Sequence, residues 1–250
     1  MARQKATTMT IPTAAMLVIG DEILSGRTRD ANMHHLAKVL TSHGFRLGEA
    51  RVVVDDHAAI IAAVRDLSAT RDHLFTSGGI GPTHDDITAE AVATAFDVPI
   101  AVRSDAHAIL QAYYDKQQIP LNEARLRMAR IPQGATLIDN PISAAPGFTL
   151  QNVHVLAGVP AIFNAMLAGL LPKLTGGVPM MSHSIRVERG EGDIAEPLGV
   201  LAKAHPELSI GCYPFSENGV SGANIVVRGQ DAIAIEHVMS HLQHLFPGAE

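Results

Sequence analysis

Apolar positions in the first two thirds of the chain come in short runs, each followed by a turn and a helical stretch. Runs such as Ala14–Ile19 and His73–Ser77 predict buried strands. The intervening stretches place apolar residues three and four positions apart, which is typical of amphipathic helices. The predicted helices are Asn32–His43, His57–Ser68 and Thr88–Phe96. This alternation predicts an α/β domain with three layers, in which helices cover both faces of a mainly parallel sheet.

Helical spacing continues in the middle of the chain. It predicts two helices, Ser104–Gln118 and Asn122–Arg130, on either side of Pro120. A later helix begins near Pro160, since proline is favoured at the first helical position. The remaining strands predicted for this part are Arg51–Val54, Ala135–Ile138 and Val153–Leu156.

Residues Leu171–Pro179 have two prolines around two glycines and predict a linker. Beyond them the pattern predicts strand, helix, strand, strand and helix, which together make a small α+β domain. These elements are His183–Arg189, Gly192–Ala204, Leu208–Tyr213, Ala223–Arg228 and Asp231–Leu245. We therefore predict a flexible tail over residues 1–12, a larger domain over 13–172 and a smaller domain over 173–250.

Composition and charge exclude several classes of function. The chain has 19 basic and 25 acidic residues, a net charge of −6, whereas proteins that coat nucleic acids need a basic face. No apolar run is long enough to span a membrane, and the first run lacks a cleavage site for secretion. The single cysteine, Cys212, fits a reducing compartment. We predict a soluble cytoplasmic protein with neither nucleic-acid nor membrane partners.

The segment TSGGIGPTHDDIT, residues 76–88, carries the strongest candidate chemistry. Its glycines permit positive φ and close approach of a ligand, and the helix start that follows offers free N–H groups to a phosphate. The candidate phosphate-binding residues are Ser77, Gly78, Gly79, Gly81, Thr83 and Thr88. Asp85 and Asp86 beside them suit Mg²⁺ or a similar hard cation that also binds phosphate oxygens, and His84 is a further candidate contact. Alternatively, the segment is only a tight turn whose aspartates cap the helix.

A second acidic cluster follows the first predicted strand in GDEILSG, residues 20–26. Because carboxyl ends of parallel strands share one edge of a sheet, Asp21 and Glu22 are expected near the glycine-rich segment. Asp30 and Asn32 come next. Helix capping is the alternative role for both, and for Asn32 it is the favoured one.

Basic side chains and histidines add one further candidate. Arg127 could bind a second phosphate, since guanidinium binds phosphate through two hydrogen bonds. Arg125 and Arg130 are interpreted as parts of a solvated face. The 13 histidines show no spacing typical of a metal site.

Several motifs together carry a family resemblance. GDEILSG, DAN, TSGGIGPTHDDIT, NEARLRMARIP and NPISAAPGF resemble the molybdopterin-binding (MoaB/Mog-type) domain of the CinA family over residues 14–170. EGDIAEPL and IGCYPF resemble the KH-like domain that follows it in CinA proteins and in the amino-terminal part of eukaryotic FAD synthases. The family's GTAPG is SAAPG here. The nicotinamide-mononucleotide deamidase domain of full-length CinA has no counterpart in this sequence, so that activity is not expected.

The resemblance also implies roles for particular residues. It places the family's phosphate loop on Gly78, Gly79, Gly81 and Thr83, with Thr88 completing the motif. It places the catalytic or metal-site acid on Asp86, with Asp85 beside it, and the GDE acid on Glu22, beside Asp21. The implied chemistries are binding or adenylylation of molybdopterin, its transfer to molybdenum, and metal-dependent hydrolysis of the pyrophosphate in ADP-ribose. Family members are usually oligomeric, so a homo-oligomer is expected.

Three hypotheses for function follow. The preferred one is binding of a phosphate-bearing nucleotide or pterin, with water attacking a pyrophosphate beside Mg²⁺ held by Asp85, Asp86 and Glu22. The second is a molybdopterin-binding or adenylyl-transferring protein without hydrolase activity. The third is a non-catalytic module whose smaller domain docks a partner. RNA is not expected there, because residues 180–250 hold four basic and nine acidic side chains, a net charge of 4 − 9 = −5.

Overall fold

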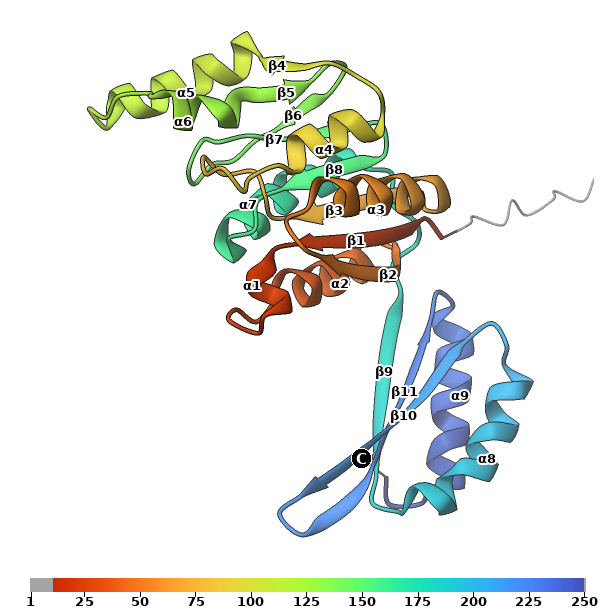
Figure 1. The fold of residues 1–250 in the computed structure, drawn as a ribbon. Helices are drawn as coiled ribbons and strands as arrows, with labels where there is room; N and C mark the ends of the chain where they lie inside the picture. Colours follow the sequence, from red (N-terminus) through yellow and green to blue (C-terminus); the bar gives the residue numbers. More distant parts are fainter. Residues whose placement is uncertain (1–10, 250) are drawn as a thin grey trace, which may run out of the picture. The chain divides into compact units, whose positions relative to one another are not determined.

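The computed structural model describes residues 11–249 and separates into two compact units, Met1–Gly177 and Val178–Glu250 (Figure 1). The tail predicted over residues 1–12 lies, apart from Ile11 and Pro12, outside the described residues. In the described part, none of the helices combines the length and the apolar character that crossing a membrane requires.

The larger unit is built on a six-stranded sheet in the order β2-β1-β3-β8-β7-β6. Five strands run in the same direction, and β7 alone runs against them, pairing antiparallel with both of its neighbours. The strands with a common direction are β1 (Thr13–Ile19), β2 (Arg46–Val53), β3 (His73–Ser77), β8 (Val153–Leu156) and β6 (Thr136–Ile138), and the reversed strand is β7 (Gly147–Leu150). The α/β class is confirmed, and the sheet is mixed: three of its pairings are parallel, and the two that β7 makes are antiparallel. The reason is the two-residue turn Gln151–Asn152, since so short a connection joins only antiparallel strands.

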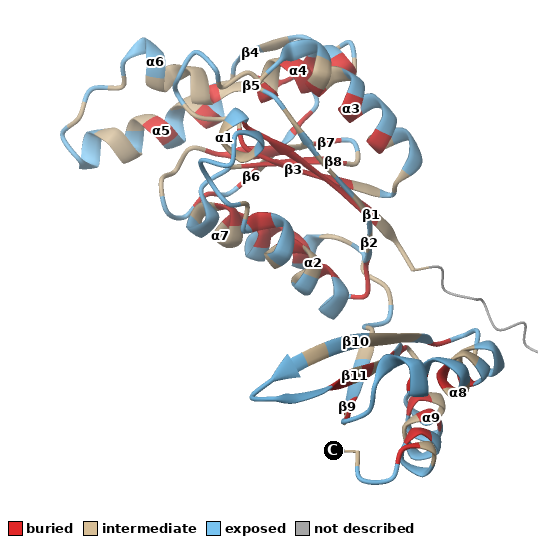
Figure 2. Ribbon diagram, turned by 60° about the horizontal axis from the view of Figure 1, so that its bottom comes forward, coloured by how far each residue is buried: buried red, intermediate tan, exposed pale blue. Residues whose placement is uncertain are grey.

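Alternating side chains of β1 divide the core of the larger unit into two layers. Ala15, Leu17 and Ile19 pack with α3 (His57–Thr70) and α4 (Thr88–Ala95). Ala14, Met16 and Val18 pack on the opposite face with α2 (Asn32–Ser42) and α7 (Pro160–Leu170). Figure 2 shows the buried stripe of these helices turned toward the sheet. Helices therefore cover both faces of the sheet. Because the faces are covered, the loops can form a site only at the ends of the strands.

The middle of the chain departs most from the sequence prediction. The single helix expected over residues 122–130 is wrong. Asn122 instead caps the one-turn helix α6 (Glu123–Leu126), a 3₁₀ turn η1 (Arg127–Ala129) follows, and Arg130 enters strand β5. The helix ends early because β5 (Arg130–Pro132) pairs with β4 (Ile100–Val102), ahead of α5 (Ser104–Lys116). This break places Arg127 in a turn.

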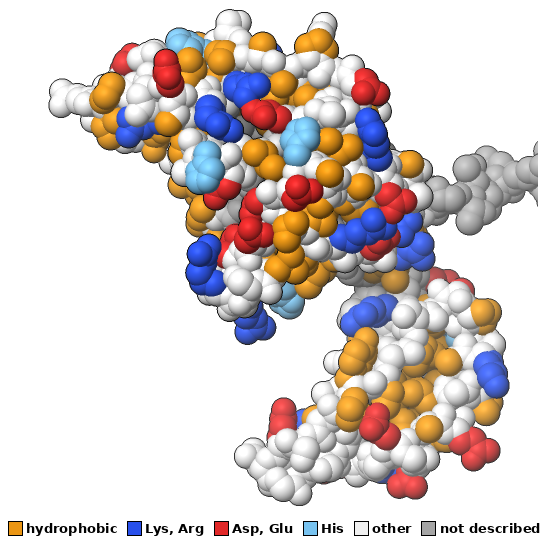
Figure 3. All heavy atoms as spheres, viewed as in Figure 1, with side chains coloured by type: hydrophobic (Ala, Val, Ile, Leu, Met, Phe, Trp, Pro, Cys, Tyr) orange, Lys and Arg blue, Asp and Glu red, His pale blue; other side chains and the backbone are white. Residues whose placement is uncertain are grey.

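The smaller unit packs two helices on one face of an antiparallel sheet in the order β10-β11-β9. Its elements are β9 (Met181–Val187), α8 (Glu191–Ala204), β10 (Ser209–Glu217), β11 (Val220–Gly229) and α9 (Ala232–Leu245). The predicted order of strands and helices is confirmed, whereas the KH-like identity stays a prediction. Ile194, Ile225 and Val238 are fully buried in its own core. Hydrophobic side chains also show along α8 and α9, which form an apolar groove that Val200 lines (Figure 3).

Candidate functional site

The carboxyl ends of β1, β3 and β8 open into a cleft of about 540 Å³. The loop after β1 contributes Gly20 and Glu22, and the loop after β8 contributes Ala157–Pro160. The loop after β3 contributes the largest set, which is Gly78, Gly79, Ile80, Gly81, Pro82, Asp85 and Asp86. This edge is where open α/β sheets bind ligands. The structure therefore brings together the two loops that sequence patterns singled out.

The glycine loop is held by contacts that only glycine allows. Gly78 and Gly79 have φ of 108° and 67°. A Cβ atom on Gly78 would lie 2.2 Å from the Ile19 carbonyl oxygen, and one on Gly79 would lie 2.1 Å from Thr88 Oγ1. Thr88 is fully buried, and its Oγ1 and N–H donate to the carbonyl oxygens of Gly78 and Gly79, each at 3.0 Å. Thr88 therefore holds the loop from the interior of the protein and does not face the cleft.

The backbone amides of this loop are available to an anion. Among residues 11–249, the N–H groups of Gly79, Ile80 and Gly81 donate to no other protein group. All three residues line the cleft, and α4 begins just beyond them. Unpaired N–H groups next to a helix start attract phosphate. This is the geometry that the glycine spacing predicts.

Asp86 and Thr83 bind each other across the tip of the loop. Asp86 Oδ2 accepts from the Thr83 N–H at 2.8 Å and from its hydroxyl at 2.5 Å. Asp86 and Asp85 line the cleft, but Thr83 does not, so its direct contact with phosphate stays a prediction. His84 is almost fully exposed and lies 3.9 Å from Asp85. The turn thus aims Asp85 and Asp86 at the cleft and leaves His84 outside it.

Asn32 has a role that sequence patterns did not indicate. The expected helix cap is wrong, because Asp30 accepts from the N–H groups of Asn32 and Met33 instead. The Asn32 side chain is buried, and its Nδ2 donates to Ser77 Oγ and to the Gly158 carbonyl oxygen, both at 2.7 Å. A Cβ atom on Gly158 would lie 3.2 Å from the Gly78 Cα atom. Asn32 therefore joins the loops after β3 and β8 where they touch beneath the cleft.

Acidic side chains gather at the β1 and β2 ends of the cleft, and one of them was missed. Asp55 lines the cleft, and its Oδ2 accepts from the Asp21 N–H at 2.9 Å. Burial raises the pKa of Asp55, and the negative charges of Asp21, Glu22 and Asp85 raise it further. Its position just after β2 was the available signal. Asp21 itself does not line the cleft.

The loop between β6 and β7 forms the remaining wall. Asn140 is buried, and its Oδ1 accepts from the N–H groups of Ile142 and Ser143, each at 3.1 Å. Its Nδ2 donates to Ser143 Oγ and to the Ala145 carbonyl oxygen. Ala144 has φ of 62°, a left-handed conformation that costs a residue with a side chain about 1 kcal/mol. Asn140 thus builds the SAAPG loop into a fixed wall.

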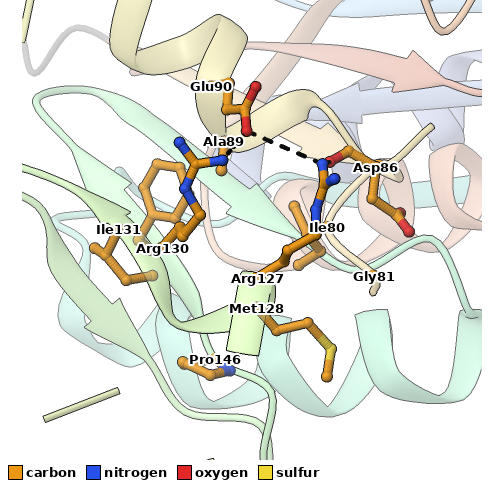
Figure 4. Close-up of a pocket in the computed structure, with 12 residues that line it drawn as sticks. Ile80, Gly81, Asp86, Ala89, Glu90, Arg127, Met128, Arg130, Ile131 and Pro146 are labelled. Carbon is orange, nitrogen blue, oxygen red and sulfur yellow. Dashed lines mark hydrogen bonds and ion pairs between the residues drawn. The ribbon is translucent and has the colours of Figure 1, made fainter. Parts of the chain in front are cut away.

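A small side pocket of about 20 Å³, room for about one water molecule, adjoins the cleft (Figure 4). Arg127 Nη2 lies 3.3 Å from the Asp86 carbonyl oxygen and 4.0 Å from Glu90 Oε1. Arg130 Nη1 pairs closely with the same Glu90 oxygen, so its assignment to a solvated face is wrong. Its place in β5 turns it toward α4. Arg125 lies outside this pocket, over the Tyr114 ring at 5.0 Å.

Comparisons with known proteins match both units. Residues 15–176 match the family described as "Probable molybdopterin binding domain", and residues 179–250 match "FAD synthase, middle domain". A protein of Caldivirga maquilingensis is 36% identical over 252 residues, which cover 94% of this chain and 98% of the relative. A CinA-like protein of Citrifermentans bemidjiense is 35% identical over 212 residues, which cover 81% of this chain and 51% of the relative.

A solved structure is similar to about two thirds of the chain. The protein CinA with unknown function from Thermoplasma acidophilum is 33% identical and superposes with a TM-score of 0.61 over 65% of this chain and 98% of that one. The matched family spans the whole cleft, from β1 to the end of α7. The chain therefore belongs to the family of molybdopterin-binding domains.

Proposed function

We propose that the larger unit binds molybdopterin or a related nucleotide by its phosphate, seated against the amides of Gly79, Ile80 and Gly81. The family match supports a pterin as the organic part of the ligand. The observation that carries the proposal is the set of three amides that find no protein acceptor among the described residues. Phosphate satisfies such groups and interacts favourably with the positive end of α4.

The rest of the cleft supports a ligand larger than phosphate. Its volume of about 540 Å³ lies in the range of small-molecule sites and exceeds the space that a phosphate group fills. Apolar side chains, among them Ile80, Met128 and Ile162, line it beside polar ones such as Asn140. A flat ring system with hydrogen-bonding edges suits this mixture. The closely packed loops after β1, β3 and β8 hold the phosphate end in place.

A second candidate function is hydrolysis of a pyrophosphate in the same cleft. Asp55 favours it, because burial and then the charges of Asp21, Glu22 and Asp85 raise its pKa, and a bound cation would offset both effects. No three histidine, cysteine, aspartate or glutamate side chains among residues 11–249 are placed to share a metal ion. Mg²⁺ commonly needs only one or two carboxylates together with phosphate oxygens. Asp85 and Asp86, with Glu22 nearby, fit that arrangement. Bound there, Mg²⁺ would neutralise charge on the phosphates.

The binding proposal is tested by replacing one glycine of the loop. We expect Gly79→Ala to weaken binding of inorganic phosphate and of molybdopterin at least tenfold, because a Cβ atom would displace Thr88 and the loop amides with it. Binding is measured by calorimetric titration. Hydrolysis is measured separately, as release of AMP when the protein is mixed with ADP-ribose and Mg²⁺. The Asp86→Asn substitution is expected to abolish this release.

Gly134→Ala is the matched control. Gly134 also has positive φ, at 83°, but a Cβ atom there meets nothing within 4 Å, and it does not line the cleft. Both substitutions impose similar backbone strain, so the control should bind phosphate like the wild type. Equal binding by the Gly79→Ala protein and the wild type would refute the proposed phosphate seat. Tight binding of molybdopterin without release of AMP from ADP-ribose would leave binding as the function and reject hydrolysis.

A further inference from the structure

The smaller unit has an apolar groove of about 470 Å³ between α8 and α9. Pro197, Val200, Leu201 and Ala204 line it from α8, and Leu245 lines it from α9. Val200 is 66% exposed, although the neighbouring Leu201 is buried in the core of this unit. Figure 3 shows hydrophobic side chains gathered on the surface of the smaller unit. An apolar surface of this kind marks a place where another molecule binds.

We propose that this groove receives α8 of a second copy of the chain, in an antiparallel pair of helices with Val200 at the centre. The two copies are then related by a two-fold axis, so that each uses the same surface. The family resemblance implies an oligomer without assigning a surface to it, and this inference names the surface. It concerns the smaller unit and does not rest on the proposed function.

The charges along α8 are the first argument for a second copy. Glu196 lies four positions before Val200, and Lys203 lies three positions after it, so all three side chains share one face of the helix. Both charged side chains are exposed. Among residues 178–249, neither of them forms an ion pair within the unit. The face of α8 therefore has a negative end, an apolar centre and a positive end.

This order of charges is complementary to itself when the helix is reversed. Along the helix axis, Glu196 lies about 6 Å before Val200, and Lys203 lies about 4.5 Å after it. In an antiparallel pair centred on Val200, the acid of each copy therefore faces the lysine of the other. The same contact forms twice because of the symmetry. A helix of an unrelated protein would need this charge order by chance, whereas a second copy always has it.

The shape and composition of the groove suit a helix with a valine at its centre. Ala204 is small, and a Cβ atom on Gly199 would meet nothing within 4 Å, so a second helix can approach α8 closely. Two exposed valines leave water when the helices pair, which favours association. His205 and His241 also line the groove, and each can donate a hydrogen bond to a carboxylate. The groove therefore holds no second acid that would repel the one on the incoming helix.

Sedimentation velocity of the full chain over a wide range of concentrations tests the assignment. The wild type is expected to associate and to dissociate on dilution. Val200→Asp should weaken association at least hundredfold, because each copy would bring a charge into an apolar groove. Ile233→Asp is the matched control. Ile233 is 78% exposed on α9 but does not line the groove, so its replacement should leave association unchanged.

Reversal of single charges tests the antiparallel arrangement itself. Glu196→Lys and Lys203→Glu each place like charges opposite one another at two symmetric contacts. Each should weaken association about tenfold. The double variant restores opposite charges at both contacts and should associate like the wild type. A mixture of the two single variants should also associate more tightly than either variant alone.

Each outcome decides for or against the groove. A wild type that is monomeric at every concentration overturns the inference. Association that Val200→Asp leaves unchanged places the interface on another part of the chain and also overturns it. Circular dichroism shows whether the Val200→Asp protein is folded. If it is not, the charge reversals decide, and a double variant that associates no better than the single ones overturns the antiparallel pair.

Discussion

At the scale of single residues, Asn32 shows how one buried amide organises a site made from distant segments. Its Nδ2 links Ser77, 45 positions away, to Gly158, 126 positions away. Its Oδ1 is buried without a partner among the described residues. A polar group kept in such surroundings costs free energy, which the two donated hydrogen bonds offset. Local sequence patterns indicate a helix start at Asn32 but contain no information about partners so far away.

Replacing Asn32 by alanine separates its structural contribution from its contribution to binding. We expect Asn32→Ala to lower the free energy of unfolding by about 1–3 kcal/mol, since the Gly158 oxygen loses its donor. It should also weaken phosphate binding, because the loops after β3 and β8 are no longer joined. Denaturant unfolding and calorimetric titration measure the two effects.

Asn152→Ala is the control for that experiment. Asn152 also donates two hydrogen bonds from Nδ2, to the carbonyl oxygens of Ser68 and Arg71, each at 2.9 Å. It precedes β8, at the edge of the sheet away from the cleft. A similar loss of stability with unchanged phosphate binding is expected. Weakened binding in both variants would mean that Asn32 acts only through overall stability.

At the scale of elements, the sequence located the buried strands well and the edges poorly. β3 was predicted with its observed bounds and β1 within one residue, because a fully buried strand is an uninterrupted apolar run. β2 lies at the edge of the sheet, and its burial alternates along Arg46–Val53. Because the first half of β2 is largely polar, the sequence pattern did not reveal its first five residues, 46–50. The glycine loop was found because it directly follows β3.

Short elements defined by pairing were missed for a different reason. β7 has four residues, and β4 and β5 have three each, too few to show a period of two. The turn at Arg127 exists because β5 must reach β4, which no local propensity expresses. Glu90 became visible as a site residue only once the pairing of β5 placed Arg127 and Arg130 beside it. Sequence patterns thus predict which segments contain functional side chains, but they do not predict which residues of other segments contact those side chains.

Three neighbouring strands share a pair of histidines that should make stability depend on pH. His154 on β8 is buried between Thr149 on β7 and His73 on β3, with ring nitrogens 3.0 Å from each. Burial, followed by the neighbouring His73, lowers the pKa of His154 to about 3. The unfolded chain, with a pKa near 6.5, binds more protons between these values. Stability is therefore full above about pH 6.5 and falls as the pH is lowered.

The size of this effect is measurable. One pKa unit corresponds to about 1.4 kcal/mol, so lowering the pH from 7 to 5 should cost about 2 kcal/mol of unfolding free energy. Denaturant titrations at a series of pH values give the slope. His154→Phe keeps an aromatic ring beside Phe75 and removes the titrating group. The slope between pH 7 and pH 5 should then flatten, and an unchanged slope would assign the effect elsewhere.

At the scale of the whole molecule, the chain holds two separate hydrophobic cores. The larger unit builds its core on both faces of β1, and the smaller unit builds one around Ile225 on β11. All residues of the proposed site belong to the larger unit. A compact unit with its own core can unfold cooperatively by itself. Ligand binding should therefore stabilise only one of the two units.

Differential scanning calorimetry should then resolve two transitions, of which phosphate-bearing ligands raise only that of the larger unit. At a free concentration 100-fold above Kd, binding adds about 2.7 kcal/mol, which corresponds to a rise of several degrees in Tm. Ile225→Ala identifies the other transition, because a cavity in the smaller core costs about 2–5 kcal/mol and should lower that Tm alone. If pyrophosphate raised both transitions equally, the two units would be energetically coupled, and the prediction of independent unfolding would be wrong.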